Sequence, residues 1–129
     1  MKYFYCDTCF LISFYQDGLL ESLSRFKDQF FISETQVVEE LKYPDDLPNK
    51  VKEAVTIIQD REEITLKAKE FEQMYVSLSS FDCLCMAFAI IDGYCLVTDD
   101  KHLITKCKKH SIETKISSDI KEEFIGKLK

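Results

Sequence analysis

The chain has 129 residues, 46% of them hydrophobic and 31% charged, and its formal net charge is −6. This length and balance are typical of one globular domain, so we expect a single domain over residues 1–129. The small numbers of Gly and Pro exclude a collagen-like chain or a long disordered segment. The acidic balance argues against a protein that coats nucleic acid, but not against a nuclease whose acids surround metal ions.

The chain has no apolar run long enough to cross a bilayer, since the longest candidate, 83–91, suits a buried helix. Asp7 interrupts the short apolar stretch at the N-terminus, which excludes a signal peptide. We therefore expect a cytoplasmic protein without membrane contact.

Six cysteines are present, and in the cytoplasm they are expected to be reduced thiols or small buried residues. They are Cys6, Cys9, Cys83, Cys85, Cys95 and Cys107. Cys6 and Cys9 have the spacing of zinc ligands, which leaves a structural zinc site as an alternative. Cys83 and Cys85 lie two apart on a predicted helix and so point to different faces.

In the first half of the chain, short apolar runs alternate with amphipathic segments. We expect strands over 2–6 and 29–32, and helices over 9–15, 19–26 and 34–42. The helix over 19–26 either continues the one before it or is separate. Val37, Val38 and Leu41 are expected on one side of the helix over 34–42. Pro44 and Pro48 mark a break and a new helix start, after which the helical spacing is carried by Val51, Val55 and Ile58.

In the second half, Ala68, Phe71 and Met74 or Tyr75 predict another helix, while 63–66 is ambiguous. Ser79 or Ser80 caps an almost wholly apolar helix that runs from 81 to 91, is typical of a domain centre and stops at Gly93. A buried strand over 95–98 and a helix with a basic outer face over 101–109 follow. An alternating strand (Ile112, Thr114, Ile116) and a final helix (Ile120, Phe124, Leu128) complete the pattern.

Strands alternating with helices predict an α/β fold of three layers, with a central, mainly parallel sheet covered by helices on both faces. In such folds, sites form outside the C-terminal ends of the strands. Asp7 directly follows the first strand, and Asp99 and Asp100 follow the strand over 95–98. Asp82 lies in the first turn of the central helix, and Glu40 lies at the edge of a buried helix face.

Each of these acids also has an ordinary structural interpretation. Asp7 and Asp100 are suitable helix N-caps, Asp82 completes a capping box with Ser79, and Glu40 can be a solvated residue beside its acidic neighbour Glu39. Acids gathered at the end of one sheet, however, repel one another unless a cation lies among them. Mg²⁺ and Mn²⁺ prefer oxygen ligands, so we expect one of them here.

Four segments resemble, in order, the motifs of the PIN-domain family: Tyr5–Ile12, Ile32–Leu41, Leu78–Ala87 and Leu96–Leu103. The first is a strand that ends in Asp followed by Thr. In the second the functional acid immediately precedes Leu, which selects Glu40. In the third, an Asp lies at the start of a helix that contains Ala. In the fourth, the acid lies two residues after Thr, which selects Asp100. Two residues depart from the pattern, since Cys9 replaces the usual Asn and Asp99 stands where Arg is frequent.

The resemblance, which is to toxin ribonucleases of the VapC type, implies a PIN-like α/β/α fold and a Mg²⁺- or Mn²⁺-dependent endoribonuclease. It implies that the residues for catalysis and for metal binding are the same four, Asp7, Glu40, Asp82 and Asp100, with Asp99 as the second choice for the fourth ligand. It also implies the toxin role in a type II toxin–antitoxin system, with RNA as substrate, a small antitoxin protein as partner and a homodimer as the assembly.

Three alternatives stay open at this point. The first two are a PIN nuclease of RNA processing and a catalytically inactive PIN-fold binding module. The third is a phosphoryl-accepting receiver domain, but this would have its acid pair after the first strand, whereas Asp99 and Asp100 come late.

Several other residues are candidates for supporting roles. The hydroxyls of Thr8 and Ser79 would orient Asp7 and Asp82, or would only cap helices. A row of lysines on the helix over 101–109 would contact RNA phosphate, or would only form a solvated face; it comprises Lys101, Lys106, Lys108 and Lys109. The two histidines, at 102 and 110, are expected at the surface.

Overall fold

A computed structural model of the protein, described over residues 1–126, has a five-stranded sheet in which every pair of neighbouring strands is parallel. The strand order is β3-β2-β1-β4-β5, with bounds Phe4–Cys6 (β1), Phe30–Ser33 (β2), Thr56–Ile58 (β3), Cys95–Val97 (β4) and Thr114–Lys115 (β5). Every residue of β1 and β4, which lie side by side in the middle, is buried. Strands covered on both faces are expected to be continuously apolar, as these are.

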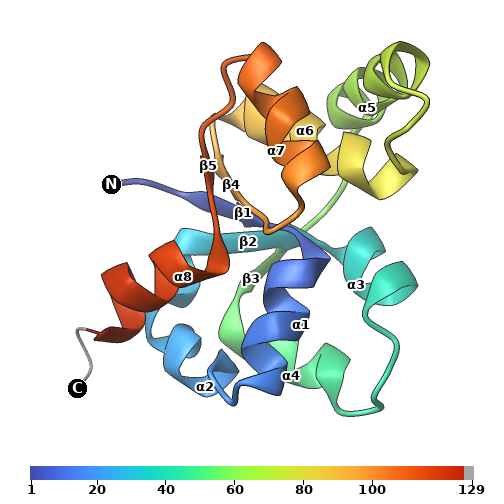
Figure 1. Ribbon diagram of the computed structural model, residues 1–129. Coiled ribbons are helices and arrows are strands. Elements are labelled where there is room, and N and C mark those ends of the chain that lie inside the picture. The colour runs from blue at the N-terminus through green and yellow to red at the C-terminus, as the bar shows by residue number, and fades with distance from the viewer. Residues whose placement is uncertain (127–129) are drawn as a thin grey trace.

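Helices cover both faces of the sheet, which confirms the three-layer α/β/α arrangement (Figure 1). The face at the top of Figure 1 carries α5 (Glu62–Met74), α6 (Ser80–Asp92) and α7 (Lys101–Lys109). The other face carries α1 (Thr8–Gln16), α2 (Leu20–Leu23), α3 (Glu34–Glu40), α4 (Leu47–Ala54) and α8 (Ser117–Ile120). A 3₁₀ segment (Ser24–Gln29) follows α2, and a π-helical segment (Lys121–Ile125) follows α8.

Helix α6 is the central helix that the sequence predicted. Its residues 83–89 are all buried, and it packs against β1 and β4. Phe88 stacks on Tyr5 with ring centroids 4.8 Å apart. The helix ends at Gly93, whose φ of 75° is a left-handed conformation that glycine adopts without steric cost. Of the two serines proposed as caps, Ser79 is the one that caps the helix.

An aromatic cluster fills the other face of the sheet. Phe4 of β1 stacks on Phe30 of β2 at 5.0 Å, and Phe124 meets both rings edge-on at 5.5 and 5.2 Å. Edge-to-face and offset-stacked pairs are the favoured aromatic geometries. The cluster therefore fixes the C-terminal π-helical segment under the middle of the sheet.

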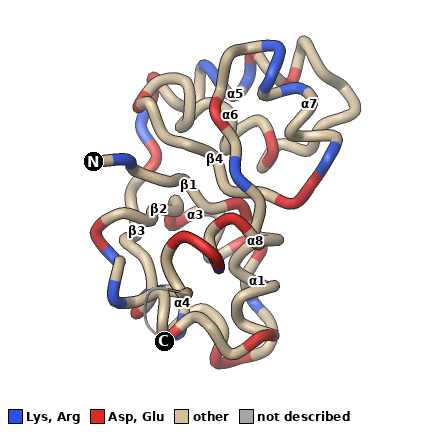
Figure 2. The backbone as a smooth tube through the Cα atoms, turned by 60° about the vertical axis from the view of Figure 1, so that its left-hand side comes forward, with Lys and Arg blue, Asp and Glu red and all other residues tan. Residues whose placement is uncertain are grey.

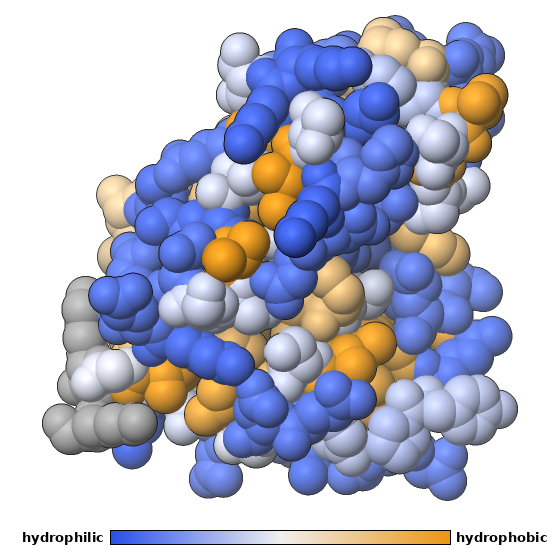
Figure 3. Space-filling view, viewed as in Figure 1, coloured by the Kyte–Doolittle hydropathy of each residue, from blue (hydrophilic) through white to orange (hydrophobic). Residues whose placement is uncertain are grey.

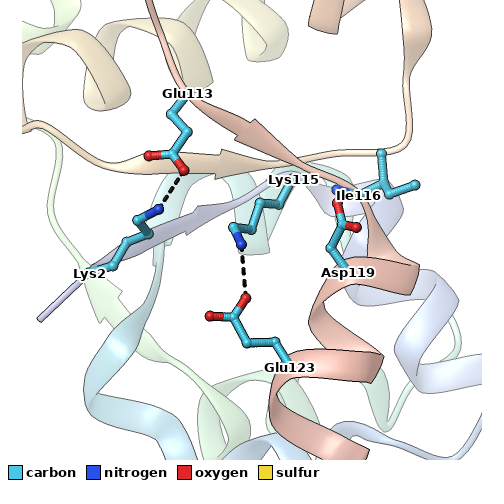
Figure 4. Close-up of polar contacts among 6 residues, drawn as sticks. All are labelled: Lys2, Glu113, Lys115, Ile116, Asp119 and Glu123. Atoms are coloured by element: carbon cyan, nitrogen blue, oxygen red, sulfur yellow. Dashed lines mark hydrogen bonds and ion pairs between the residues drawn. The ribbon is translucent and has the colours of Figure 1, made fainter.

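Ion pairs line the edge of the sheet at β5 (Figure 4). Lys115 pairs with Glu123 at 2.9 Å, and Lys2 pairs with Glu113. Exposed pairs of this kind contribute about 0–1 kcal/mol each. Their main effect here is to place charge beside an open strand edge, which discourages pairing with another chain.

Strand β3 is the main element that the sequence interpretation missed. We expected Val55 and Ile58 to continue a helix, but α4 ends at Ala54 and Val55 is extended. The run from Val55 to Ile58 consists of β-branched residues, which favour a strand once a neighbouring strand is available. The ambiguous segment 63–66 lies inside α5.

Other expectations need smaller corrections. Helix α3 stops at Glu40, and Val38 is 53% exposed while Val37 and Leu41 are buried, so these three do not share one side as we expected. The segment 19–26 divides into α2 and the 3₁₀ segment, which itself contains a kink at Phe26, whose dihedral angles are not helical. The strand predicted over 112–116 shrinks to two residues, and Leu128 lies outside the described residues.

His110 is also not the surface residue that we expected. It is half-buried, its Nε2 lies 2.7 Å from the hydroxyl of Tyr75, and its ring meets Phe71 edge-on. His102 is exposed, as predicted. Among the described residues no helix combines the length and apolar character needed to cross a membrane.

Candidate metal centre

The two central strands bring the first and fourth motifs together. Along the chain, β2 and β3 are added on one side of β1, and β4 and β5 on the other. Cys6 is in register with Val97, and the N–H of Asp7 donates to the carbonyl of Val97 at 2.9 Å. Asp7 and Thr98 therefore leave the sheet side by side, at the switch point where ligands bind in folds of this kind.

Asp7 is a buried carboxylate whose two oxygens are both bonded. It is 6% exposed and caps α1, with Oδ1 accepting from the N–H of Thr8 at 2.8 Å. Oδ2 accepts from the hydroxyl of Thr98 at 2.7 Å and from the thiol of Cys9 at 3.1 Å. The capping interpretation of Asp7 is thus correct, and the same carboxylate also lies at the switch point. Cys9 supplies a polar contact to Asp7 although it departs from the family pattern.

Thr98 was not among the predicted site residues. It is fully buried, and its hydroxyl donates to Asp7 and accepts from the N–H of Asp100 at 3.1 Å. One side chain therefore joins the acids of two motifs. The available signal was the Thr-x-Asp spacing of the fourth motif, which we had used only to choose between neighbouring acids.

Glu40 is the last residue of α3, and its carboxylate is held by one oxygen. Oε1 accepts from Nε2 of Gln36 at 3.3 Å and from the hydroxyl of Thr8 at 3.4 Å. We expected the Thr8 hydroxyl to orient Asp7, but only the backbone N–H of Thr8 does so. Gln36, which is fully buried, was also missed by the sequence interpretation.

Asp82 and Asp100 are anchored by helix N-termini. Oδ2 of Asp82 accepts from the N–H of Ser79 at 3.2 Å, while the Ser79 hydroxyl accepts from the N–H of Asp82 at 3.0 Å. This is the predicted capping box, so the Ser79 hydroxyl holds the backbone of Asp82 and not its carboxylate. Oδ1 of Asp100 accepts from the N–H groups of His102 and Leu103 at 2.9 and 3.2 Å.

Three of the four acids therefore share one arrangement: within residues 1–126, one carboxylate oxygen accepts hydrogen bonds and the other accepts none. Within residues 1–126 no hydrogen bond reaches Oε2 of Glu40, Oδ1 of Asp82 or Oδ2 of Asp100. In the same part of the chain, no Lys or Arg forms an ion pair with any of the four acids. The group is thus a set of oriented oxygen donors without a protein cation.

The acids also act on one another electrostatically. Burial raises the pKa of Glu40, the nearby charges of Asp7 and Asp82 raise it further, and the hydrogen bonds from Gln36 and Thr8 oppose the rise. Burial likewise raises the pKa of Asp82, with contributions in the same direction from Asp7 and Asp100 and an opposing one from Ser79. A cation placed among these groups would relieve both effects.

A Mg²⁺ or Mn²⁺ ion at these acids would need waters to complete its coordination. Over the described residues, no three His, Cys, Asp or Glu side chains are grouped closely enough to hold an ion by themselves. Mg²⁺, however, commonly binds through one or two carboxylates and retains several waters. Burial and the charge of Asp7 raise the pKa of the Cys9 thiol to about 11, in keeping with the hydrogen bond that this thiol donates to Asp7.

Asp99 is turned away from the other acids. Its Oδ1 accepts from the N–H of Ser117 at 2.7 Å, and its Oδ2 accepts from the Ser117 hydroxyl. These bonds tie the end of β4 to the start of α8. Asp100, by contrast, is bonded to Thr98 and raises the pKa of Asp82. The two neighbours therefore have different surroundings, as expected for successive residues after a strand.

The predicted basic residues lie on α7, whose first turn follows Asp100. Lys101, Lys108 and Lys109 are exposed, while Lys106 is half-buried with its Nζ 5.1 Å from the ring centre of Tyr75. None of these four forms an ion pair within the described part of the chain. Figure 2 shows basic segments on α7, acidic segments around α8, and segments of both signs on α5.

Comparison with known proteins supports the fold. No family model matches the chain, and no curated protein matches it. Among solved structures, the chain is similar to the crystal structure of PAE2754 from Pyrobaculum aerophilum, with a TM-score of 0.75 and 14% sequence identity. The match covers 97% of this chain and 98% of the other. The shared architecture therefore extends over nearly the whole of both chains.

Proposed function

We propose that this protein is a Mg²⁺- or Mn²⁺-dependent endoribonuclease that hydrolyses phosphodiester bonds with a metal-activated water. The observation that carries the proposal is that Asp7 lies at the switch point, while Glu40, Asp82 and Asp100 each keep one oxygen without a hydrogen bond within residues 1–126. The order of the four acidic motifs, which resembles that of PIN-domain ribonucleases, supports the same function.

The roles that we propose differ according to how each acid is held. A bound Mg²⁺ or Mn²⁺ would lower the pKa of its water and polarise a phosphoryl oxygen. The free oxygens of Glu40, Asp82 and Asp100 would hold the ion or its waters, while Asp7 supplies a fixed buried charge. Because water is the nucleophile, the chain needs no nucleophilic side chain.

The lysines of α7 are proposed to contact the RNA backbone. Lys101 directly follows Asp100, and the other three lie in the last turn of α7, so a strand whose phosphate reaches the acids would run along this helix to contact them. Phosphate contacts of this kind orient a nucleic acid without reading its sequence. They would also offset the net charge of −6, which otherwise repels RNA.

We also propose the role of a toxin that is controlled by a small antitoxin and forms a homodimer, on the resemblance to VapC-type ribonucleases. Met74 and Val76 are exposed at the α5–α6 connection, and Leu66 and Ile90 are exposed on α5 and α6 themselves. On the face seen in Figure 3, apolar residues form separate small patches within a hydrophilic surface. Such a surface suits a modest protein interface better than a large permanent one.

The first prediction concerns metal and RNA. Millimolar Mn²⁺ or Mg²⁺ should raise the melting temperature, because a ligand that binds only the folded state stabilises it. The protein should cleave total cellular RNA with either ion and stop when EDTA is added. Asp7→Asn should lose cleavage, whereas Asp45→Asn, which changes an exposed acid, should behave as wild type. An intact fold that neither binds the ion by calorimetry nor cleaves RNA would refute the proposed function.

The second prediction concerns stability without metal. A carboxylate whose pKa is raised in the folded state contributes stability below its unfolded pKa of about 4, and this is lost as pH rises through the folded value. At pH 7 in EDTA, Glu40→Gln and Asp82→Asn should therefore melt a few degrees above wild type. The advantage should disappear at pH 4. Lower melting temperatures for both variants at pH 7 would mean that these acids are structural.

The third prediction separates the adjacent acids. Asp100→Asn should reduce cleavage by about 100-fold or more, as loss of a positioned active-site charge does, while Asn still caps α7. Asp99→Asn should cleave normally but lose about 1 kcal/mol of stability, because an amide cannot accept both hydrogen bonds from Ser117. RNA cleavage and denaturant unfolding measure the two effects. The opposite ranking in cleavage would make Asp99 the functional acid.

A further inference from the structure

Gln36 is a fully buried amide directly beneath the candidate metal centre. It lies one helical turn before Glu40 on α3, so the two side chains share a helix face. A buried amide is costly unless its polar atoms are bonded, and an apolar residue of similar size would avoid that cost. The polar side chain therefore needs an explanation beyond packing.

The orientation of the Gln36 amide is set by Tyr5 from inside the sheet. The Tyr5 hydroxyl accepts from the N–H of Ser33 at 3.0 Å, so its own proton is available to the Oε1 of Gln36. The nitrogen end is thereby turned outward, where Nε2 donates to Oε1 of Glu40 at 3.3 Å and lies 3.4 Å from the sulfur of Cys85. The reverse orientation would bring two acceptors, Oε1 of Gln36 and Oε1 of Glu40, against each other.

We propose that Gln36, oriented by Tyr5, is a positioning residue that fixes Oε1 of Glu40 toward the interior and leaves Oε2 for the metal. Glu40 is the last residue of its helix, and its only other partner within residues 1–126 is the Thr8 hydroxyl at 3.4 Å. Without Gln36, the carboxylate would lose its main orienting donor. This inference rests on the proposed metal-dependent function.

The test compares Gln36→Met and Tyr5→Phe with wild type below the melting temperature of every protein. Partners that orient a metal ligand typically change affinity or rate by about 10-fold or more when removed. Gln36→Met should therefore weaken Mn²⁺ binding, measured by calorimetry, and lower kcat by about 10-fold. KM for RNA should not change, because the α7 lysines are untouched. Tyr5→Phe should act in the same direction with a smaller effect.

A stability-matched control separates positioning from folding. Ile64→Ala removes a buried side chain from α5, lowers the melting temperature and should leave Mn²⁺ affinity and kcat at wild-type values. Wild-type Mn²⁺ binding by Gln36→Met would overturn the inference while the proposed function stands. If wild type itself bound no Mn²⁺, the proposed function would fail first and the inference with it.

Discussion

The hydrogen bond from the Thr98 hydroxyl to the Asp7 carboxylate is the interaction on which the candidate site depends. It joins the ends of the two central strands, and the same hydroxyl accepts the N–H of Asp100. A carboxylate that is 6% exposed must be well bonded, and both oxygens of Asp7 are. The sheet register between Cys6 and Val97 brings the two side chains together, so the site follows from the strand order.

The carboxylates around Asp7 repel one another electrostatically, which is a cost that an arrangement with a purely structural role would avoid. Burial and neighbouring carboxylates raise the pKa of Glu40 and Asp82, and no Lys or Arg within residues 1–126 pairs with either. Perturbed acids gathered at a strand-end switch point are typical of functional sites. The helix N-termini that anchor Asp82 and Asp100 partly compensate, because their N–H groups favour negative charge.

The sequence predicts features that depend on neighbouring residues in the chain. It does not predict contacts between residues that are far apart in the chain. The alternation of strands and helices, the capping pattern of Ser79 and Asp82, and the stop at Gly93 are local signals, and the structure confirms them. Thr98 and Gln36 each have a local partner, in Asp100 and Glu40, but their other partners, Asp7 and Tyr5, lie 91 and 31 residues away, where no spacing rule connects them. Strand β3 was missed for the same reason, since its three residues become a strand only beside β2.

The central proposal is that a divalent ion binds beside Asp7, Glu40, Asp82 and Asp100. The most direct measurement is anomalous diffraction from crystals of the wild-type protein soaked in millimolar Mn²⁺. The account predicts an anomalous peak near the buried carboxylate of Asp7, beside Oε2 of Glu40, Oδ1 of Asp82 and Oδ2 of Asp100, and none beside Asp99. The absence of a peak at the four acids, or a peak between Asp99 and Ser117 instead, would contradict it.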